Sequence, residues 1–585
     1  MNLIALLACG HEPDSSGPQG DGLLDHGPLD PFPTSALLKD GRLALADDAW
    51  PELATPLPLH TLAWRSGFSP AQPAVIGLAV DPADLPGPDA LVTDGSVRLF
   101  DIDDGNWLPV LAEVDAWPDA VDPVLLVRPL TALASGHDVA VVVTTRAAPR
   151  PDSFDPARQT DLMAALASAG LPEDDVALAF SFPIDDPTGP IREAIANRAA
   201  LDTWTLDRVR NADAGDVVAP RTWRAAEGRF DVTSFLIDGK TLDRDDAGTL
   251  QPVGIDDAPL YVHIPTSVAH APAETAPILI FGHGIFGQPS DYLDDFADAD
   301  GVLALADELG AVVVATTWRG LSADERADVV GVAADFGQFP LVTDRLVQAQ
   351  VDVATLLDLA RGPLFEAPEL LGAEGQVLAD RDRVLYYGIS LGGIEGAVFA
   401  AQSHPVDRVA LHVGGAMWST LLERSSDWPL FEYLMVDAVV EPSDRQRLYA
   451  LSQLWWDPVD PQSWTAPLEQ VDLLLQLSIG DEQVRNLTSE AFARSIGLDQ
   501  LAPTVYDVPG LPIVTNETLR GFVQFDPEVA IPPETNRPAA VTGAHQGPRS
   551  WSGTRAQVRA WLLGEPIAPT CGVAPCSASN PNGAG

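Results

Sequence analysis

The hydrophobic positions of the chain change their pattern near residue 256. Before that point, short runs rich in Val, Ile and Leu are separated by clusters of Asp, Pro and Gly, which is typical of antiparallel strands joined by turns. These runs lie at 74–80, 97–102, 124–127, 139–145, 176–182 and 229–237. One short helix is expected at 162–169, ended by Gly170. We therefore expect residues 28–255 to form a β-rich, sandwich-like N-terminal region.

After residue 256, short strands that are apolar on both faces alternate with amphipathic helices. The predicted strands lie at 277–281, 311–316, 384–387, 409–413 and 473–479. A long helix is expected to begin at Thr343, and a last helix to cover 552–563. This alternation indicates an α/β fold with a doubly wound, mostly parallel sheet in residues 256–565.

Composition and charge narrow the class of protein. The chain has 585 residues, a formal net charge of −50 and 46% hydrophobic residues. The apolar content excludes wholesale disorder, and the strong negative charge excludes nucleic acid as a partner, because the phosphate backbone would be repelled. No run of 18 apolar residues is present, so no membrane span is predicted.

The first residues carry a possible export signal. Leu6-Leu7-Ala8-Cys9 ends a short apolar segment, residues 1–9, and resembles the lipobox of bacterial lipoproteins, in which the cysteine is acylated. Residues 10–27 are rich in Gly, Pro, Asp and Ser, as expected of a flexible linker. The resemblance implies an exported protein of the cell envelope, anchored to a membrane through Cys9. The alternative is an ordinary cytosolic N-terminus.

Two further cysteines, Cys571 and Cys576, lie in the C-terminal tail, residues 566–585. They are close enough in sequence to pair if the protein resides in an oxidising compartment. The three cysteines of the chain are then one lipid-modified residue and one loop disulfide.

A candidate nucleophile follows the predicted strand 384–387. The sequence Gly388-Ile389-Ser390-Leu391-Gly392 lies where a strand passes into a helix. A sharp turn there exposes a serine hydroxyl above the carboxyl end of the sheet and leaves no room for a side chain at Gly388 or Gly392. The alternative is a glycine-rich helix start with a capping serine.

With the segment Gly282-His283-Gly284-Ile285-Phe286-Gly287, which closes the strand 277–281, this motif makes the chain resemble the α/β-hydrolases. The similarity is to bacterial secreted lipases and esterases that carry a β-rich N-terminal region. It implies that Ser390 is the nucleophile and that the backbone amides of Leu391 and Ile285 form the oxyanion hole. Phe286 is the alternative to Ile285.

A serine nucleophile needs a histidine base and an acidic partner for that base. Of ten histidines, His545 lies in a loop directly before the last predicted helix, whereas His283 belongs to the oxyanion segment. In this fold the chain order is Ser, then Asp or Glu, then His. Asp481 falls just past the strand 473–479 and resembles the acid of the family; the adjacent Glu482 is the second choice.

An insertion at about 414–470 separates two of the predicted strands and is unusually aromatic. It contains Trp418, Trp428, Phe431, Tyr433, Trp455, Trp456 and Trp464. In the family, this position holds a cap over the active site, and an apolar cap suits a neutral acyl chain. The alternative is that the rings form only the insertion's own core.

Together these features predict a serine carboxylic ester hydrolase, lipase or esterase, that acts on neutral small-molecule or lipid esters and needs no cofactor or metal ion. Two alternatives remain open from the sequence. One is a peptidase or amidase that uses the same triad. The other is a non-catalytic envelope protein whose β-rich half binds a surface polymer.

Overall fold

We describe a computed structural model of the chain that covers residues 31–87, 91, 94–120, 123–297, 301–402 and 406–582. The lipobox-like segment with Cys9 and the whole predicted linker, residues 10–27, lie outside these residues. In the part of the chain that the structure describes, no helix combines the length and apolar character needed to cross a bilayer.

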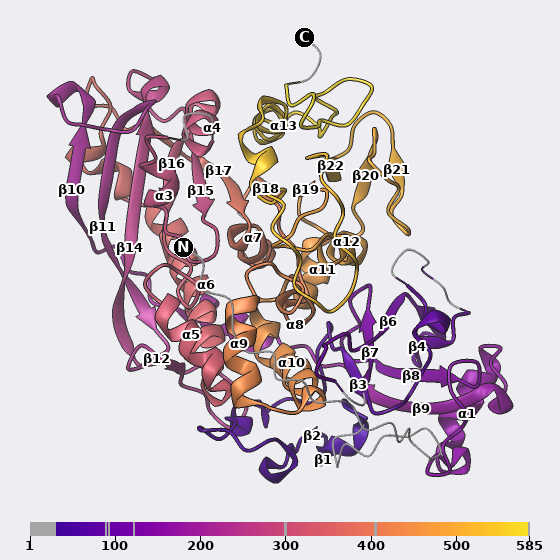
Figure 1. Ribbon diagram of the computed structural model, residues 1–585. Coiled ribbons are helices and arrows are strands. Elements are labelled where there is room, and N and C mark those ends of the chain that lie inside the picture. The colour runs from indigo at the N-terminus through magenta and orange to yellow at the C-terminus, as the bar shows by residue number, and fades with distance from the viewer. Residues whose placement is uncertain are drawn as a thin grey trace, which may run out of the picture.

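The fold is α/β and is built on one eleven-stranded sheet (Figure 1). In spatial order its strands are β10 (Trp204–Asn211), β11 (Thr222–Ser234), β14 (Gly254–Pro265), β16 (Val312–Ala315), β15 (Ala276–Gly282), β17 (Ala379–Ile389), β18 (Arg408–His412), β19 (Leu473–Ser478), β22 (Arg520–Phe525), β20 (Asp499–Leu501) and β21 (Ile513–Val514). From β16 to β21 neighbouring strands are parallel, and β10, β11 and β14 are antiparallel. The predicted mostly parallel sheet is thus confirmed.

The sheet begins earlier than the change of pattern at residue 256 suggests. That position lies inside β14; β11 pairs with β14, and β10 pairs with β11, so both preceding strands extend the sheet. Boundaries at 255 and 256 therefore divide one strand. On β10, apolar and polar residues alternate at first, as in a half-exposed antiparallel strand, whereas β11 is mostly buried. Antiparallel strands of this kind resemble those of the N-terminal region although they belong to the large sheet.

Helices cover both faces of the sheet because successive side chains of its central strands point to opposite sides. On β15, Ile278 and Ile280 pack into the larger core, and Leu279 and Phe281 into a second core on the other face. The helices are α1 (Thr160–Ser168), α2 (Gly189–Asn197), α3 (Ser290–Leu293), α4 (Val302–Leu309), α5 (Arg326–Ala334), α6 (Pro340–Arg361), α7 (Leu391–Gln402), α8 (Trp418–Leu422), α9 (Pro429–Ala438), α10 (Pro442–Trp456), α11 (Thr465–Leu468), α12 (Asn486–Ser495) and α13 (Ser552–Leu562). The longest, α6, begins at Pro340, not at Thr343, because proline is favoured in the first helical turn; Thr343 lies buried inside it.

The N-terminal region forms two antiparallel sheets, as predicted. One contains β3 (Ala74–Ile76), β7 (Leu125–Pro129) and β6 (Val110–Val114), and the other β5 (Asn106–Leu108), β4 (Val97–Asp101), β8 (Asp138–Thr144) and β9 (Val176–Pro183). The expected short helix is α1, and Gly170 follows it with a positive φ of 86°. Two hairpins, β1 (Leu38–Lys39) with β2 (Arg42–Leu43) and β12 (Leu236–Ile237) with β13 (Thr241–Leu242), complete the strands.

The insertion between β18 and β19 contains α8, α9, α10 and α11 and is called the cap below. Figure 1 shows the N-terminal sheets beside the cap, at the end of the molecule away from α4 and α13. The contact includes buried ion pairs: Arg128 on β7 binds Glu113 on β6 at 2.6 Å and also Glu423, directly after α8. Arg424 binds Glu113 as well. Burial alone would raise the pKa of Glu113, but Arg424 and Arg128 outweigh it and hold that pKa below its usual value.

A second set of contacts holds the end of α10. Arg65 binds Asp457 at 2.7 Å, and Asp185 in the N-terminal region at 3.2 Å. The Trp455 indole donates to the Thr61 hydroxyl at 2.9 Å. Buried charged and polar groups therefore hold the end of α10 against the N-terminal region.

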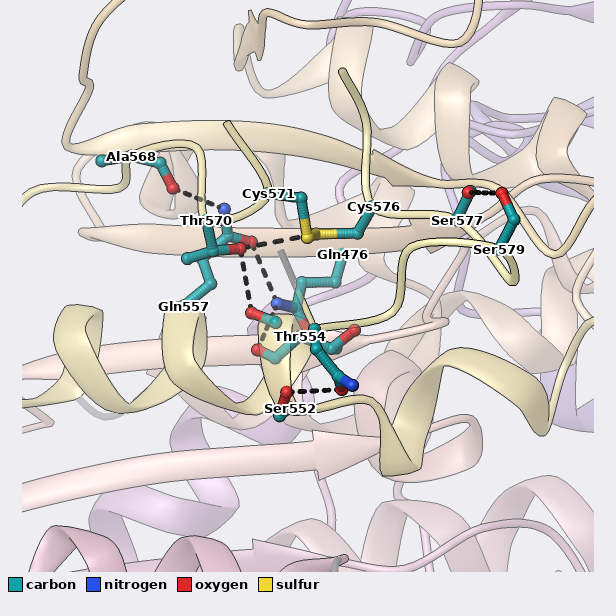
Figure 2. The surroundings of a disulfide bond; sticks show 12 residues. Gln476, Ser552, Thr554, Gln557, Ala568, Thr570, Cys571, Cys576, Ser577 and Ser579 are labelled. Carbon is teal, nitrogen blue, oxygen red and sulfur yellow. Dashed lines mark hydrogen bonds between the residues drawn. A yellow bond between two sulfur atoms is a disulfide. The ribbon is translucent and has the colours of Figure 1, made fainter. Parts of the chain in front are cut away.

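The C-terminal tail is fastened to the last helix by the Cys571–Cys576 disulfide, which confirms the expected pairing (Figure 2). A Cβ at Gly553 of α13 would lie 2.8 Å from Cys571 Sγ, so only glycine allows this approach. Gln557 of the same helix donates to the Ala568 carbonyl at 2.8 Å. Gln476 of β19 donates to Gln557 at 3.0 Å, which ties the helix and tail to the middle of the sheet (Figure 2).

Replacing Arg128 with methionine should lower the free energy of unfolding by about 3–5 kcal/mol, because it leaves Glu113 and Glu423 buried with one shared arginine. Urea denaturation followed by tryptophan fluorescence measures the loss. The matched control is Arg192→Met, which breaks a pair with Asp186 in which both side chains are 52% exposed and should cost about 0–1 kcal/mol. Equal losses for the two variants would contradict the importance of the buried contact.

Candidate active site

Ser390 lies in the sharp turn between β17 and α7. Its φ is +57°, an uncommon value for a residue with a side chain, and its amide donates to the His412 carbonyl of β18 at 2.9 Å. A Cβ at Gly388 would lie 2.0 Å from the Gly392 carbonyl oxygen, and one at Gly392 would lie 2.2 Å from the Gly282 oxygen. The turn thus requires glycine at both positions, as the sequence motif predicts.

His283 holds the loop that faces this turn. Its carbonyl accepts the Gly392 amide at 2.9 Å, and its Nε2 accepts the Trp318 amide at 2.9 Å. Nδ1 lies 2.8 Å from the Gly284 carbonyl and must therefore carry the proton. Burial lowers the pKa of His283 to about 4, so the ring is neutral at neutral pH. Its contacts are structural, as the family resemblance implies.

The loop brings a backbone amide close to the serine. A Cβ at Gly284 would lie 4.0 Å from Ser390 Oγ, which places the Gly284–Ile285 peptide beside this hydroxyl. The Phe286 amide donates to the Leu321 carbonyl at 2.8 Å and is already engaged. Within the described residues, no hydrogen bond is found for the amides of Ile285 or Leu391. Ile285 is therefore better placed than Phe286 to supply an oxyanion-hole donor beside Leu391.

The predicted base and acid are in contact. His545 Nδ1 lies 2.9 Å and 2.8 Å from the two carboxylate oxygens of Asp481, and both side chains are almost fully buried. The amides of Gln483 and Val484 donate to the same carboxylate, each at 2.9 Å, and fix its orientation. Nδ1 donates to Asp481, so Nε2 is left as the basic nitrogen.

Glu482, the second choice for the acid, has a different place. It accepts the Thr542 hydroxyl at 2.9 Å, the Gly543 amide at 3.1 Å and the His545 backbone amide at 3.2 Å. Burial alone would raise the pKa of this carboxyl, but these donors outweigh it and lower the pKa. Glu482 holds the loop that carries His545, and its carboxylate does not contact the imidazole.

The sheet explains why these residues lie at one edge. β17, β18, β19 and β22 are adjacent and parallel, so their carboxyl ends lie at one edge. Ser390 follows β17, Asp481 follows β19, and the loop with His545 is tied back to β19 by Ser478 Oγ, which donates to the Ala544 carbonyl at 2.7 Å. No hydrogen bond joins Ser390 to His545 among the described residues. Such contacts often close only when a substrate is bound.

An apolar cavity opens onto Ser390. It encloses about 900 Å³ of space, including the part open to solvent. Its walls come from the oxyanion loop, from α5 and the start of α6, and from the cap; they include Ile285, Phe286, Val329, Val332, Phe336, Phe339, Trp418, Leu421, Trp428, Phe431, Met435 and Trp456. Asp427, at the start of the cap helix α9, is the one charged residue in this lining.

The cap aromatics divide between the two roles that the sequence leaves open. Trp418, Trp428, Phe431 and Trp456 line the cavity, and Trp418 stacks on Trp456 with ring centres 4.6 Å apart. The other three rings do not line it. Trp464 is fully buried within the cap, Trp455 contacts the N-terminal region, and Tyr433 is 68% exposed.

Sequence reasoning missed the wall formed by α5 and by Phe336 and Phe339. This helix has little amphipathic character, and nothing in its sequence marks it as part of a site. Asp427 was also missed because it is one of 84 acidic residues, and only its position beside the catalytic edge distinguishes it.

Asp101, Asp103 and His137 form the one group of potential metal ligands among the described residues, with ligand atoms within 4.8 Å of one another. Asp101 accepts the amides of Asp103 and Asp104 and contacts His137 Nδ1 at 2.9 Å. These hydrogen bonds account for the arrangement without an ion. The group lies at one end of the paired strands β4 and β8 of the N-terminal region, whereas Ser390 lies on the large sheet.

No protein-family model matches the chain, and no curated protein sequence is significantly similar to it. Acetyl xylan esterase 1 from Thermoanaerobacterium sp. JW/SL YS485 is a similar solved structure, with 14% identity, a TM-score of 0.34, and coverage of 53% of this chain and 84% of that one. An acetyl xylan esterase from Paenibacillus sp. R4 has 12% identity, covers 57% and 84%, and has a TM-score of 0.32. Pyrococcus horikoshii acylaminoacyl peptidase has 15% identity, covers 53% and 40%, and has a TM-score of 0.31. At these low values, the function has to be inferred from the chain's own residues.

The environment of His545 predicts how its imidazole titrates. Burial alone would lower its pKa, but Asp481 outweighs burial, so the pKa lies above the ordinary value of 6.5. In Asp481→Asn this opposing charge is gone, and His545 should titrate at lower pH than in the wild type. NMR of ¹³C-labelled histidine measures both values, and His545→Gln assigns the signal. An unchanged pKa in Asp481→Asn would contradict the pairing.

Proposed function

We propose that the protein is a serine hydrolase that cleaves neutral carboxylic esters through an acyl-enzyme. Ser390 Oγ attacks the ester carbonyl while His545 Nε2 takes its proton, and Asp481 stabilises the imidazolium. The amides of Leu391 and Ile285 donate to the tetrahedral oxyanion. His545 then returns the proton to the leaving alcohol, and water, activated by His545, releases the acid.

One observation carries this proposal: Ser390, held at positive φ, lies at the same sheet edge as the buried Asp481–His545 pair. A capping serine at a helix start has no need of strained backbone, of an ordered loop opposite its hydroxyl or of a histidine oriented by a carboxylate. The apolar cavity beside Ser390 favours an ester with an uncharged acyl chain over a charged peptide.

An activity-based probe tests the assignment of Ser390. A fluorophosphonate should label the wild type covalently, and Ser390→Ala should lose the label while it keeps the same thermal unfolding midpoint. Hydrolysis of p-nitrophenyl esters should disappear in Ser390→Ala and fall at least about 10³-fold in His545→Ala, because the hydroxyl then has no base. A wild type that neither reacts with the probe nor cleaves any ester would support a non-catalytic protein and end the proposal.

Two adjacent tryptophans allow a matched test of the acyl cavity. Trp456 lines it. Trp455 does not line it: its indole donates to Thr61, and its ring packs on Phe339 of the wall, with ring centres 5.8 Å apart. In Trp456→Ala, kcat/KM should fall about 10-fold more for an octanoate ester than for an acetate ester, because only the longer chain reaches the missing wall. In Trp455→Ala, the two esters should differ much less, because this ring reaches the cavity only through Phe339. A p-nitrophenyl ester series from two to twelve carbons measures this, and equal slopes for the two variants would contradict the acyl cavity.

A further inference from the structure

A second recess continues outward from the acyl cavity. The two share Ile285, Phe286, Asp427, Phe431 and Gln483, so a ligand can occupy both while its carbonyl lies at Ser390. The recess encloses about 1030 Å³, including the part open to solvent. The recess lies between the loop after His283, the start of α9 and the loop after His545. We take it as the side on which the leaving alcohol departs.

The two compartments differ in chemistry. The inner cavity is almost entirely apolar, whereas half of the residues that line the outer recess are polar: Arg326, Ser426, Asp427, Gln483 and Gln546. In the described part of the chain, none of these five side chains has a hydrogen bond or an ion pair to the protein. The Arg326 guanidinium lies over the Phe286 ring, 5.4 Å from its centre.

The backbone that carries these groups is fixed. The Ser426 amide donates to the Glu482 carbonyl at 2.7 Å, and the Gln483 amide to the Asp481 carboxylate at 2.9 Å. Gln546 follows His545, whose loop Glu482 holds. These polar side chains therefore project from backbone that is hydrogen-bonded to Asp481 and Glu482. Little loss of backbone freedom is then needed when a ligand binds.

We propose that this recess binds the alcohol part of the ester and that this alcohol is a small polyhydroxylated molecule, with Asp427 accepting hydrogen bonds from its hydroxyl groups. The proposal rests on the ester hydrolase function above and adds its substrate class. The acyl chain occupies the apolar cavity, and the alcohol leaves through the recess after His545 protonates it.

Other kinds of alcohol fit the recess less well. A long apolar alcohol would cover the five polar side chains and give them no partners, which costs affinity. An anionic group would lie near Asp427, Asp481 and Glu482. A quaternary ammonium group needs free aromatic faces, and Arg326 already covers the face of Phe286. Hydroxyl groups both donate and accept, and so match a mixed set of carboxylate, amide, hydroxyl and guanidinium groups.

Three esters of one acid test the proposal: glycerol monooctanoate, ethyl octanoate and octanoylcholine. They share the acyl chain, so any difference between them reports on the recess. In Asp427→Ala, the ratio of kcat/KM for the glycerol ester to that for the ethyl ester should fall about tenfold or more, because a charged acceptor of hydrogen bonds is lost. Gln546→Ala should lower the same ratio by a smaller factor. The control is Asp437→Ala, which removes an exposed carboxylate of α9 outside the recess and should keep the wild-type ratio.

The outcomes separate this proposal from the one on which it rests. If Asp427→Ala and Gln546→Ala change both esters equally, the polyhydroxylated alcohol is wrong, while cleavage of ethyl octanoate by Ser390 still supports the ester hydrolase. If octanoylcholine loses more than the glycerol ester in Asp427→Ala, the recess binds a cation instead. If the wild type cleaves none of the three and does not react with a fluorophosphonate, both proposals fail. The ratio is taken within each variant, so a partial loss of folded protein does not affect it.

Discussion

The buried ion pairs between the N-terminal sheets and the cap are the constraint on which the rest of the structure depends. Arg128, Glu113, Glu423 and Arg424 have little or no exposure, so each charge needs its partners in place. Because charged side chains without water tolerate few alternative arrangements, the contact fixes one position of α8 relative to β6 and β7. The cap supplies much of the apolar cavity beside Ser390, so the N-terminal region, which contributes no residue to that lining, still determines its shape.

The residues proposed to act in catalysis are held in turn by their own buried neighbours. The strained turn at Ser390 persists because Gly388, Gly392 and Gly282 let two strands and a helix approach closely. The opposite loop is held by the neutral ring of His283, and the base by Asp481 and Glu482. Each group that would act on a substrate is thus positioned by a buried neighbour.

The sequence was sufficient for the parts governed by local rules. These rules place Ser390 between a strand and a helix. The choice of Asp481 and His545 comes from the resemblance to the α/β-hydrolases, and the structure brings these two side chains into contact. Two parts could not be predicted in this way. β10 and β11 join the large sheet through antiparallel pairing with strands that follow them, which no local pattern in their own sequence encodes. The wall formed by α5, Phe336 and Phe339 depends on how the cap packs, which no periodicity along the chain encodes.

The contact between the cap and the N-terminal sheets also bears on the order in which the two parts of the chain fold. Translation produces β3 to β9 well before α8 and α10, and domains generally fold as they emerge, N-terminal parts first. The partners Arg128 and Glu113 can therefore be ordered before Glu423 and Arg424 leave the ribosome. The N-terminal region then acts as a template on which the cap assembles, so that the wall of the cavity forms only after both halves of the chain have met.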